Sequence, residues 1–207
     1  MRDMIAAMQP QEFEDARLLW KMFYAGQSFE HSRVAAKYVL QKNIIEDEPI
    51  FYPLMAAVYV LYGKPFKKSC GVGCPIGEDI IPQDYLELHR DLLKHRDKIL
   101  AHSDANKFEL FDVGQANQVR LVVRSPTDKS LICSQLQANR PLLPHIISLC
   151  LELQEKVESS KIELFKRYEK YAPNAVGEYI LNIDDPNGAF FKPAKPVVEA
   201  NSENDRK

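Results

Sequence analysis

Residues 85–104 read YLELHRDLLKHRDKILAHSD, and this stretch decides how the chain folds. With about 100° of rotation per residue in an α-helix, its leucines and isoleucine gather on one broad apolar arc. Pro82 lies near the start, and Asp84 complements the positive N-terminal end of the helix dipole. We therefore predict an amphipathic helix over residues 82–102.

Two polar residues, His89 and Arg96, fall in the middle of this apolar arc. Burying an unpaired arginine costs free energy, so we expect Arg96 to meet a carboxylate, a backbone carbonyl or a partner chain. A structural interpretation is that Arg96 joins one helix to another through Asp97 or Asp104 of a neighbour. A functional interpretation is equally open, because sequences tend to break their local rules at functional sites.

A second line of residues, His95 and His102, follows the polar edge of the arc, with Lys98 close to it. An exposed histidine at a helix end suits general acid or base catalysis near neutral pH. The alternative is a surface histidine that the helix dipole stabilises as a cation. Arg96 and His102 point about 120° apart on a regular helix. They converge only if the helix ends at Ala101, or if two copies of the helix meet across a two-fold axis.

Outside this stretch, apolar residues recur at helical spacing in four further segments. We predict helices over residues 10–24, 29–42, 49–62 and 141–171. The first two are separated by Gly26 and Ser28, which are typical of a break between helices. Prolines 53 and 144 are expected in or near the first turns of their helices.

A β-hairpin interrupts the helical pattern. Residues 107–113 and 118–124 alternate in the manner of strands around the turn sequence GQAN, so we predict a hairpin over about 107–124. Thr127 or Ser130 is expected to lead into the next helix, and residues 178–183 are expected to form a short strand. We predict one domain over 1–183 and a disordered tail over 184–207, where prolines and charges dominate.

Composition excludes several classes of protein. The chain has 207 residues, 45% of them hydrophobic, and a net charge of −2, which rules out disorder throughout and a globally basic nucleic-acid binder. Its longest apolar run, 54–62, is short for a membrane span, and we expect a cytoplasmic protein. Cys70 and Cys74 lack a second close cysteine pair, so we expect reduced thiols and no metal site.

Arg96-Asp97 followed by Ile99-Leu100-Ala101-His102 resembles the signature of the HEPN superfamily, an arginine and a polar residue followed by a histidine. The longer string LHRDLLKHRDKILAHSD is similar to HEPN-like proteins of the abortive-infection, phage-defence type. The stretch YGKPFKKSCGVG, residues 62–73, also resembles a segment that precedes this helix in such proteins. The resemblance is close over residues 59–104 and looser over 10–172.

The resemblance implies a fold and a set of site residues. The implied fold is an all-α helical bundle of HEPN type that forms a homodimer, here with a small β-hairpin insertion and a disordered C-terminal tail. Active members are ribonucleases that need no metal or cofactor, because the 2′-hydroxyl of RNA is the nucleophile. By this resemblance Arg96 would neutralise the scissile phosphate, His102 would act as general acid or base, and Asp97 would orient the site. We assign substrate binding to four neighbours, His95, Lys98, Ser103 and Asp104.

Two functions follow as hypotheses. The first is a metal-independent endoribonuclease, as a defence or toxin component, with an antitoxin or nucleotidyltransferase as partner. The second is a non-catalytic HEPN-like module that binds RNA, nucleotide or a protein. Basic clusters are only local, at 64–68 and 161–170, and the second of these is interleaved with glutamates. Phosphate-dominated binding should weaken steeply with salt, whereas a salt-independent interaction would indicate a protein partner.

Overall fold

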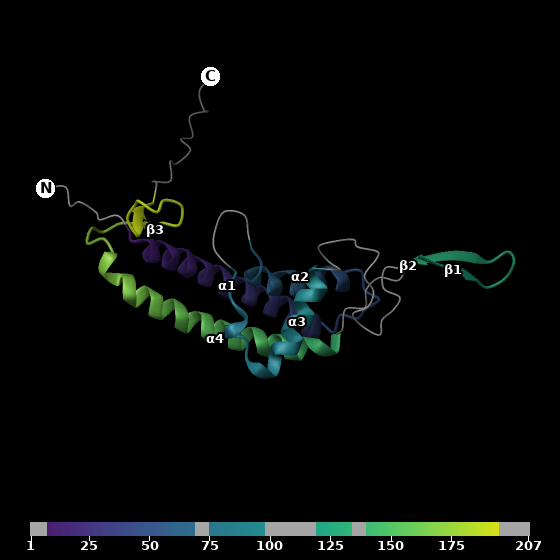
Figure 1. Ribbon diagram of the computed structural model, residues 1–207. Coiled ribbons are helices and arrows are strands. Elements are labelled where there is room, and N and C mark those ends of the chain that lie inside the picture. Colours follow the sequence, from purple (N-terminus) through teal and green to yellow (C-terminus); the bar gives the residue numbers. More distant parts are fainter. Residues whose placement is uncertain (1–7, 69–74, 98–118, 134–139, 195–207) are drawn as a thin grey trace, which may run out of the picture.

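The computed structural model describes residues 8–68, 75–97, 119–133 and 140–194, and these residues are mainly helical (Figure 1). In these ranges the α-helices are α1 Pro10–Gln41, α2 Phe51–Gly63, α3 Leu86–His95 and α4 Leu143–Tyr168. The strands β1 Val119–Val123 and β2 Lys129–Cys133 form one antiparallel sheet, and β3 Tyr179–Leu181 and β4 Phe191–Pro193 form another. Short 3-10 turns occur at Lys64–Phe66, Glu78–Ile80, Gln83–Tyr85, Arg140–Leu142 and Glu169–Tyr171. The prediction of a mainly α-helical fold is confirmed.

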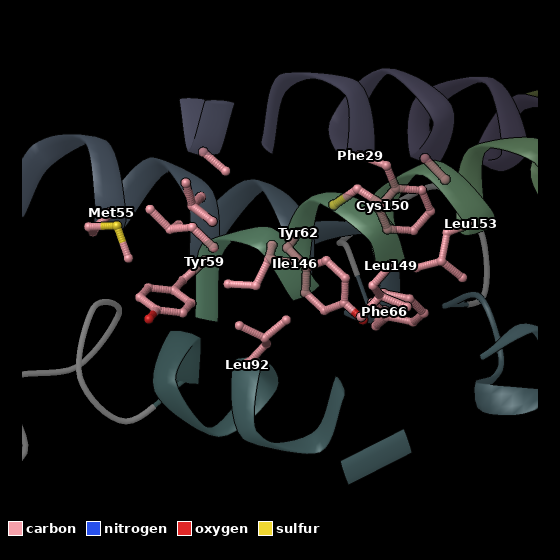
Figure 2. Packing of buried hydrophobic residues seen from close by; sticks show 14 of the residues in the cluster. Phe29, Met55, Tyr59, Tyr62, Phe66, Leu92, Ile146, Leu149, Cys150 and Leu153 are labelled. Atoms are coloured by element: carbon pink, nitrogen blue, oxygen red, sulfur yellow. The ribbon is translucent and has the colours of Figure 1, made fainter. Parts of the chain in front are cut away.

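The two longest helices, α1 and α4, lie side by side (Figure 1). Helix α2 packs against α1, and α3 packs against α2. Apolar side chains from all four helices meet in the main core (Figure 2). Its largest buried members include Phe29, Met55, Tyr59, Tyr62, Leu92, Leu149 and Leu153. Burying one such side chain stabilises the fold by roughly 1.5–3 kcal/mol, so Leu92 fixes α3 against this core.

Helix α1 is continuous over 32 residues, and the prediction of two helices with a break at Gly26 and Ser28 is wrong. Gly26 packs against α4, where a β-carbon at residue 26 would lie 3.7 Å from Cγ1 of Val157. Ser32, six residues further along α1, donates a hydrogen bond to the carbonyl oxygen of Val58 at 2.8 Å. Such packing offsets the cost of about 1 kcal/mol that glycine adds in a helix interior.

The other predicted helices are confirmed in the described residues. Pro53 lies in the first turn of α2, and Pro144 in the first turn of α4. Both placements agree with the absence of an intrahelical partner for the first N–H groups of a helix. The helix predicted over 82–102 begins with the 3-10 turn Gln83–Tyr85 and continues as α3; residues 98–102 lie outside the described part.

The hairpin lies further along the chain than predicted. The predicted strand 118–124 is confirmed as β1, and β1 pairs with β2, with Leu121 opposite Leu131. The other predicted strand, 107–113, lies outside the described residues. The prediction that Thr127 or Ser130 leads into a helix is wrong, because Ser130 lies in β2. The hydroxyl of Ser125 accepts hydrogen bonds from the backbone N–H groups of Thr127 and Asp128, and this serine turn closes the hairpin.

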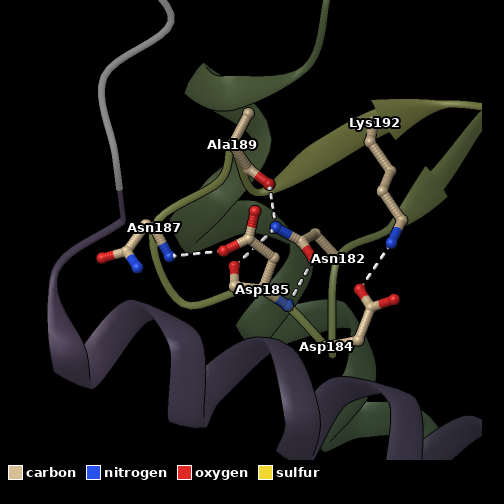
Figure 3. Close-up of polar contacts among 6 residues, drawn as sticks. All are labelled: Asn182, Asp184, Asp185, Asn187, Ala189 and Lys192. Carbon is tan, nitrogen blue, oxygen red and sulfur yellow. Dashed lines mark hydrogen bonds and ion pairs between the residues drawn. The ribbon is translucent and has the colours of Figure 1, made fainter.

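Ordered structure continues past residue 183, so the predicted disordered tail is wrong for residues 184–194. The side-chain amide of Asn182 donates to the carbonyl oxygens of Asp185 and Ala189 at 2.9 and 2.8 Å, and its oxygen accepts from the Asp185 N–H (Figure 3). These bonds hold a tight loop that returns the chain as β4. The loop places Phe190 in a second core, whose other buried members are Met8, Ala16, Leu19, Leu164 and Tyr168. Residues 195–207 of the predicted tail lie outside the described part.

Candidate functional site

The end of α3 carries Arg96 and Asp97, which continue the helix as a wider π-type turn. The carbon chain of Arg96 lies across the last residue of α2, where a β-carbon on Gly63 would lie 3.1 Å from Cγ of Arg96. The arginine side chain is 24% exposed, and its Nη1 donates to Oδ1 of Asp97 at 2.7 Å. Of the three kinds of partner expected for Arg96, the structure supplies a carboxylate, and it belongs to the next residue.

Asp97 connects this arginine to a lysine from a different segment. Its Oδ2 forms an ion pair with Nζ of Lys67, which follows the 3-10 turn after α2. Partial burial alone would raise the pKa of Asp97, but hydrogen bonds from Lys67 and Arg96 outweigh it and lower that pKa. Asp97 is therefore a carboxylate at neutral pH, and it holds two cationic side chains in fixed positions.

Two further lysines extend this group. Lys21 of α1 is 1% exposed, and its Nζ donates to the carbonyl oxygen of Lys67 at 3.5 Å. Lys21 and Lys64 both place their ammonium groups over the ring of Tyr24, at 5.6 and 5.1 Å from its centroid. We call Lys21, Lys64, Lys67 and Arg96, together with Asp97, the cationic cluster. Its cations outnumber its one carboxylate, so its local potential favours an anion.

His95 does not lie on the polar edge of α3, and the prediction that placed it there is wrong. Its side chain is only 8% exposed and stacks on the ring of Tyr59, with centroids 5.3 Å apart and planes 12° apart. Burial lowers the pKa of His95, although the nearby carboxylate of Asp91 raises it. A neutral, stacked imidazole of this kind holds α3 on α2, and it lacks the exposure that a substrate-binding histidine requires.

His89 is fully buried, as its position on the apolar arc predicts. Its Nδ1 lies 2.8 Å from the hydroxyl of Tyr62, and its ring packs against Phe66 in a T-shaped arrangement. Burial raises the pKa of the Tyr62 hydroxyl and lowers the pKa of His89. The tyrosine therefore donates to a neutral imidazole, whose Nε2 then carries the proton and lies 3.7 Å from Oε1 of Glu78. The Tyr62–His89 hydrogen bond joins α3 to α2.

The structure thus brings two of the predicted site residues together, Arg96 and Asp97. The remaining predicted residues, Lys98, His102, Ser103 and Asp104, lie outside the described residues, as do Cys70 and Cys74. Their contacts are therefore part of the prediction alone.

Sequence reasoning missed the contribution of α1 to the cluster. Lys21 and Tyr24 stand three residues apart, which places them on one face of a helix. The sequence offered a signal, since Lys21 is the one charged residue within the apolar run of residues 18–25. The sequence does not show that the helix face carrying Lys21 and Tyr24 packs against Lys67, which follows α2.

In the described part of the chain, no group of three or more His, Cys, Asp or Glu side chains is arranged to hold a metal ion. Nor does any of the helices described there combine the length and apolar character needed to cross a bilayer.

Comparison of the chain with protein-family models, with curated proteins and with solved structures gives no match. The HEPN resemblance of residues 59–104 therefore stays a prediction, and the role of the cationic cluster is inferred from its own chemistry.

Proposed function

We propose that the chain is a metal-independent endoribonuclease of HEPN type that binds RNA phosphates at the cationic cluster. In this proposal Arg96 neutralises the scissile phosphate, Asp97 holds Arg96 and Lys67 in place, and His102 transfers protons. A role in phage defence or as a toxin, in the cytoplasm and beside an antitoxin or nucleotidyltransferase, belongs to the same proposal.

The observation that carries the proposal is the placement of Arg96. Its carbon chain lies against Gly63 and its guanidinium is bound by Asp97, yet the side chain keeps 24% of its surface exposed. An arginine restrained in this way loses little conformational freedom when it binds a second anion. Lys67, bound to the same carboxylate, adds a second positive charge that would strengthen the binding of a phosphate.

The chemistry needs no metal. The 2′-oxygen of the RNA attacks the adjacent phosphorus, the bond from phosphorus to the 5′-oxygen breaks, and a 2′,3′-cyclic phosphate and a 5′-hydroxyl result. A base takes the proton of the 2′-hydroxyl, and an acid gives a proton to the departing 5′-oxygen. His102 serves one of these two roles, while Arg96 stabilises the negative charge that builds up on the phosphate.

A homodimer completes this proposal. Arg96 and His102 point about 120° apart on one regular helix, so a second copy across a two-fold axis supplies the complementary group. Sedimentation velocity of the full chain measures this directly, and the same samples serve in the cleavage assay.

The test is cleavage of end-labelled RNA by the full chain in excess chelator, with the ends of the products identified. We expect 2′,3′-cyclic phosphate and 5′-hydroxyl ends, and a loss of about 100-fold or more in rate for Arg96→Ala and for His102→Ala. Arg90→Ala is the matched control for arginine, because Arg90 lies on the same helix and its side chain is 56% exposed. His145→Ala, at an exposed position of α4, is the control for histidine.

Two outcomes contradict the proposal. One is equal cleavage by the parent and by both Arg96→Ala and His102→Ala. The other is a lack of cleavage by the folded parent on several structured and unstructured RNAs.

A second candidate function, a non-catalytic module that binds a protein, is favoured by a different surface. Phe23 of α1 and Ile162 and Phe165 of α4 are each about half exposed, and they border a hollow of about 330 Å³. Exposed apolar groups gathered in one place are typical of protein-binding surfaces. Binding that needs these residues and does not change with salt would support this candidate.

A further inference from the structure

Two aromatic rings lie side by side on α1, next to the cationic cluster. The rings of Trp20 and Tyr24 are one helical turn apart, with centroids 5.5 Å apart and planes within 7° of parallel. Both side chains are half-buried, and neither belongs to the two buried clusters of the described residues. The stack of Tyr168 on Phe190, by contrast, lies inside the second core. The Trp20–Tyr24 pair therefore lies outside both cores, and each of the two residues is partly exposed.

An unbroken series of contacts links this pair to Arg96. The ammonium groups of Lys21 and Lys64 lie over Tyr24, and Lys21 also contacts the carbonyl oxygen of Lys67. Lys67 and Arg96 in turn share the carboxylate of Asp97. The cations thus lie at the Tyr24 end of the pair, which leaves Trp20 as the ring further from the charge.

We propose that Trp20 and Tyr24 form a stacking platform for an unpaired nucleobase of single-stranded RNA whose phosphates bind Lys64, Lys67 and Arg96. The inference rests on the proposed function and names the form of its substrate. The aromatic rings suit a nucleobase, because every base has a π-face that can stack on them. The cations beside them suit the phosphate of the same nucleotide. A base inside a duplex keeps both faces stacked, so the platform selects loops and single strands.

Trp20 is itself the reporter, because it is the only tryptophan in the chain. The probe is a dye-labelled 2′-O-methyl RNA of about ten nucleotides, within the range that single-strand-binding grooves cover. It has no free 2′-hydroxyl and is not cleaved. An abasic strand of the same length carries the same phosphates without bases. We expect the base-bearing strand to quench Trp20 emission and to bind about ten-fold more tightly than the abasic strand.

Variants test the same inference without relying on quenching. Tyr24→Leu and Trp20→Leu should each weaken binding of the base-bearing strand by about ten-fold and leave the abasic strand unchanged. Trp20→Phe keeps a ring and should restore most of the affinity, which separates stacking from a defect in folding. Tyr38→Leu is the matched control, because this aromatic side chain lies on the same helix and is 46% exposed.

The outcomes separate the platform from the proposed ribonuclease. Equal binding of both strands without quenching, together with cleavage that depends on Arg96, overturns the platform and leaves the ribonuclease standing. Quenching by the base-bearing strand without cleavage of any RNA supports the platform as part of a binding module. Binding of neither strand overturns the platform and the phosphate site together.

Discussion

Gly63, the last residue of α2, lies directly beneath the side chain of Arg96 at the end of α3. A β-carbon at residue 63 would lie 3.1 Å from Cγ and 3.3 Å from Cδ of Arg96, and 3.3 Å from Cδ2 of Leu93. These separations are shorter than ordinary van der Waals contact. Glycine therefore sets how closely the arginine approaches α2, and through Asp97 it also sets where Lys67 is held.

Gly63→Ala should displace Arg96 without unfolding the protein. Alanine favours the helix by up to about 1 kcal/mol, which offsets the crowding, so the free energy of unfolding should change by less than that amount. The affinity for the 2′-O-methyl RNA should fall several-fold, because the guanidinium moves. Gly26→Ala is the control, since its β-carbon meets Val157 at an ordinary 3.7 Å; it should stabilise by about 0.5–1 kcal/mol and leave affinity unchanged. Unchanged affinity in Gly63→Ala would contradict this account.

Tyr62→Phe should destabilise the fold by about 1–3 kcal/mol, because it leaves Nδ1 of the fully buried His89 without its donor. Urea unfolding followed by circular dichroism measures the change. Tyr38→Phe removes the hydroxyl of a tyrosine that is 46% exposed and should have almost no effect. Equal stability of the two variants would show that the Tyr62–His89 hydrogen bond does not stabilise the protein.

The stability of the protein should fall as the pH drops below about 6.5, the ordinary pKa of histidine. Burial lowers the pKa of both His89 and His95 in the folded state. Between the lowered pKa values and about 6.5 the unfolded chain binds more protons than the folded chain, so acid favours unfolding. The stability that the two neutral histidines contribute is fully present above this pH range and is lost as the pH falls through it. His95→Gln should flatten the dependence measured by urea unfolding, whereas His31→Gln, at an exposed position of α1, should not.

Phe190→Ala should destabilise the protein by about 3–5 kcal/mol, because Phe190 is 2% exposed and stacks on Tyr168 in the second core. Val176→Ala, at a fully exposed position in the preceding loop, should cost almost nothing. The free energy of unfolding of each variant decides the matter. A cost below about 1 kcal/mol for Phe190→Ala would mean that residues 184–194 contribute little to the fold.

Local pattern predicted the helices well, and the errors arose where distant residues decide the outcome. Gly26 and Ser28 are typical of a helix break, but α1 continues because Val157 and the carbonyl of Val58 receive that face of the helix. Neither partner is visible from residues 26–32. Prolines and charges after residue 183 suggested a tail, yet one asparagine, Asn182, organises the loop that carries Phe190 into a core.

Only part of the candidate site was predicted, because contacts between distant residues are not visible in the sequence. Arg96 and Asp97 were found because they stand together within one periodic stretch, and a charge on an apolar arc is visible in the sequence. His95 was misplaced, because its burial depends on Tyr59 of another helix. Lys21 and Tyr24 were missed, because their relation to Lys67 exists only once α1 and the turn after α2 are packed together.

The second core joins segments that are far apart in the sequence, so it can form only late while the chain is being synthesised. Ala16 and Leu19 are made early, but their partners Leu164, Tyr168 and Phe190 come near the end of the described chain. At a ribosomal rate of about 5–20 residues per second, the first half of α1 waits roughly 7–30 s for Leu164 to be made. During that interval an apolar helix face is open to solvent, so the nascent chain presents a chaperone-binding or aggregation-prone segment until residues 164–190 have been made.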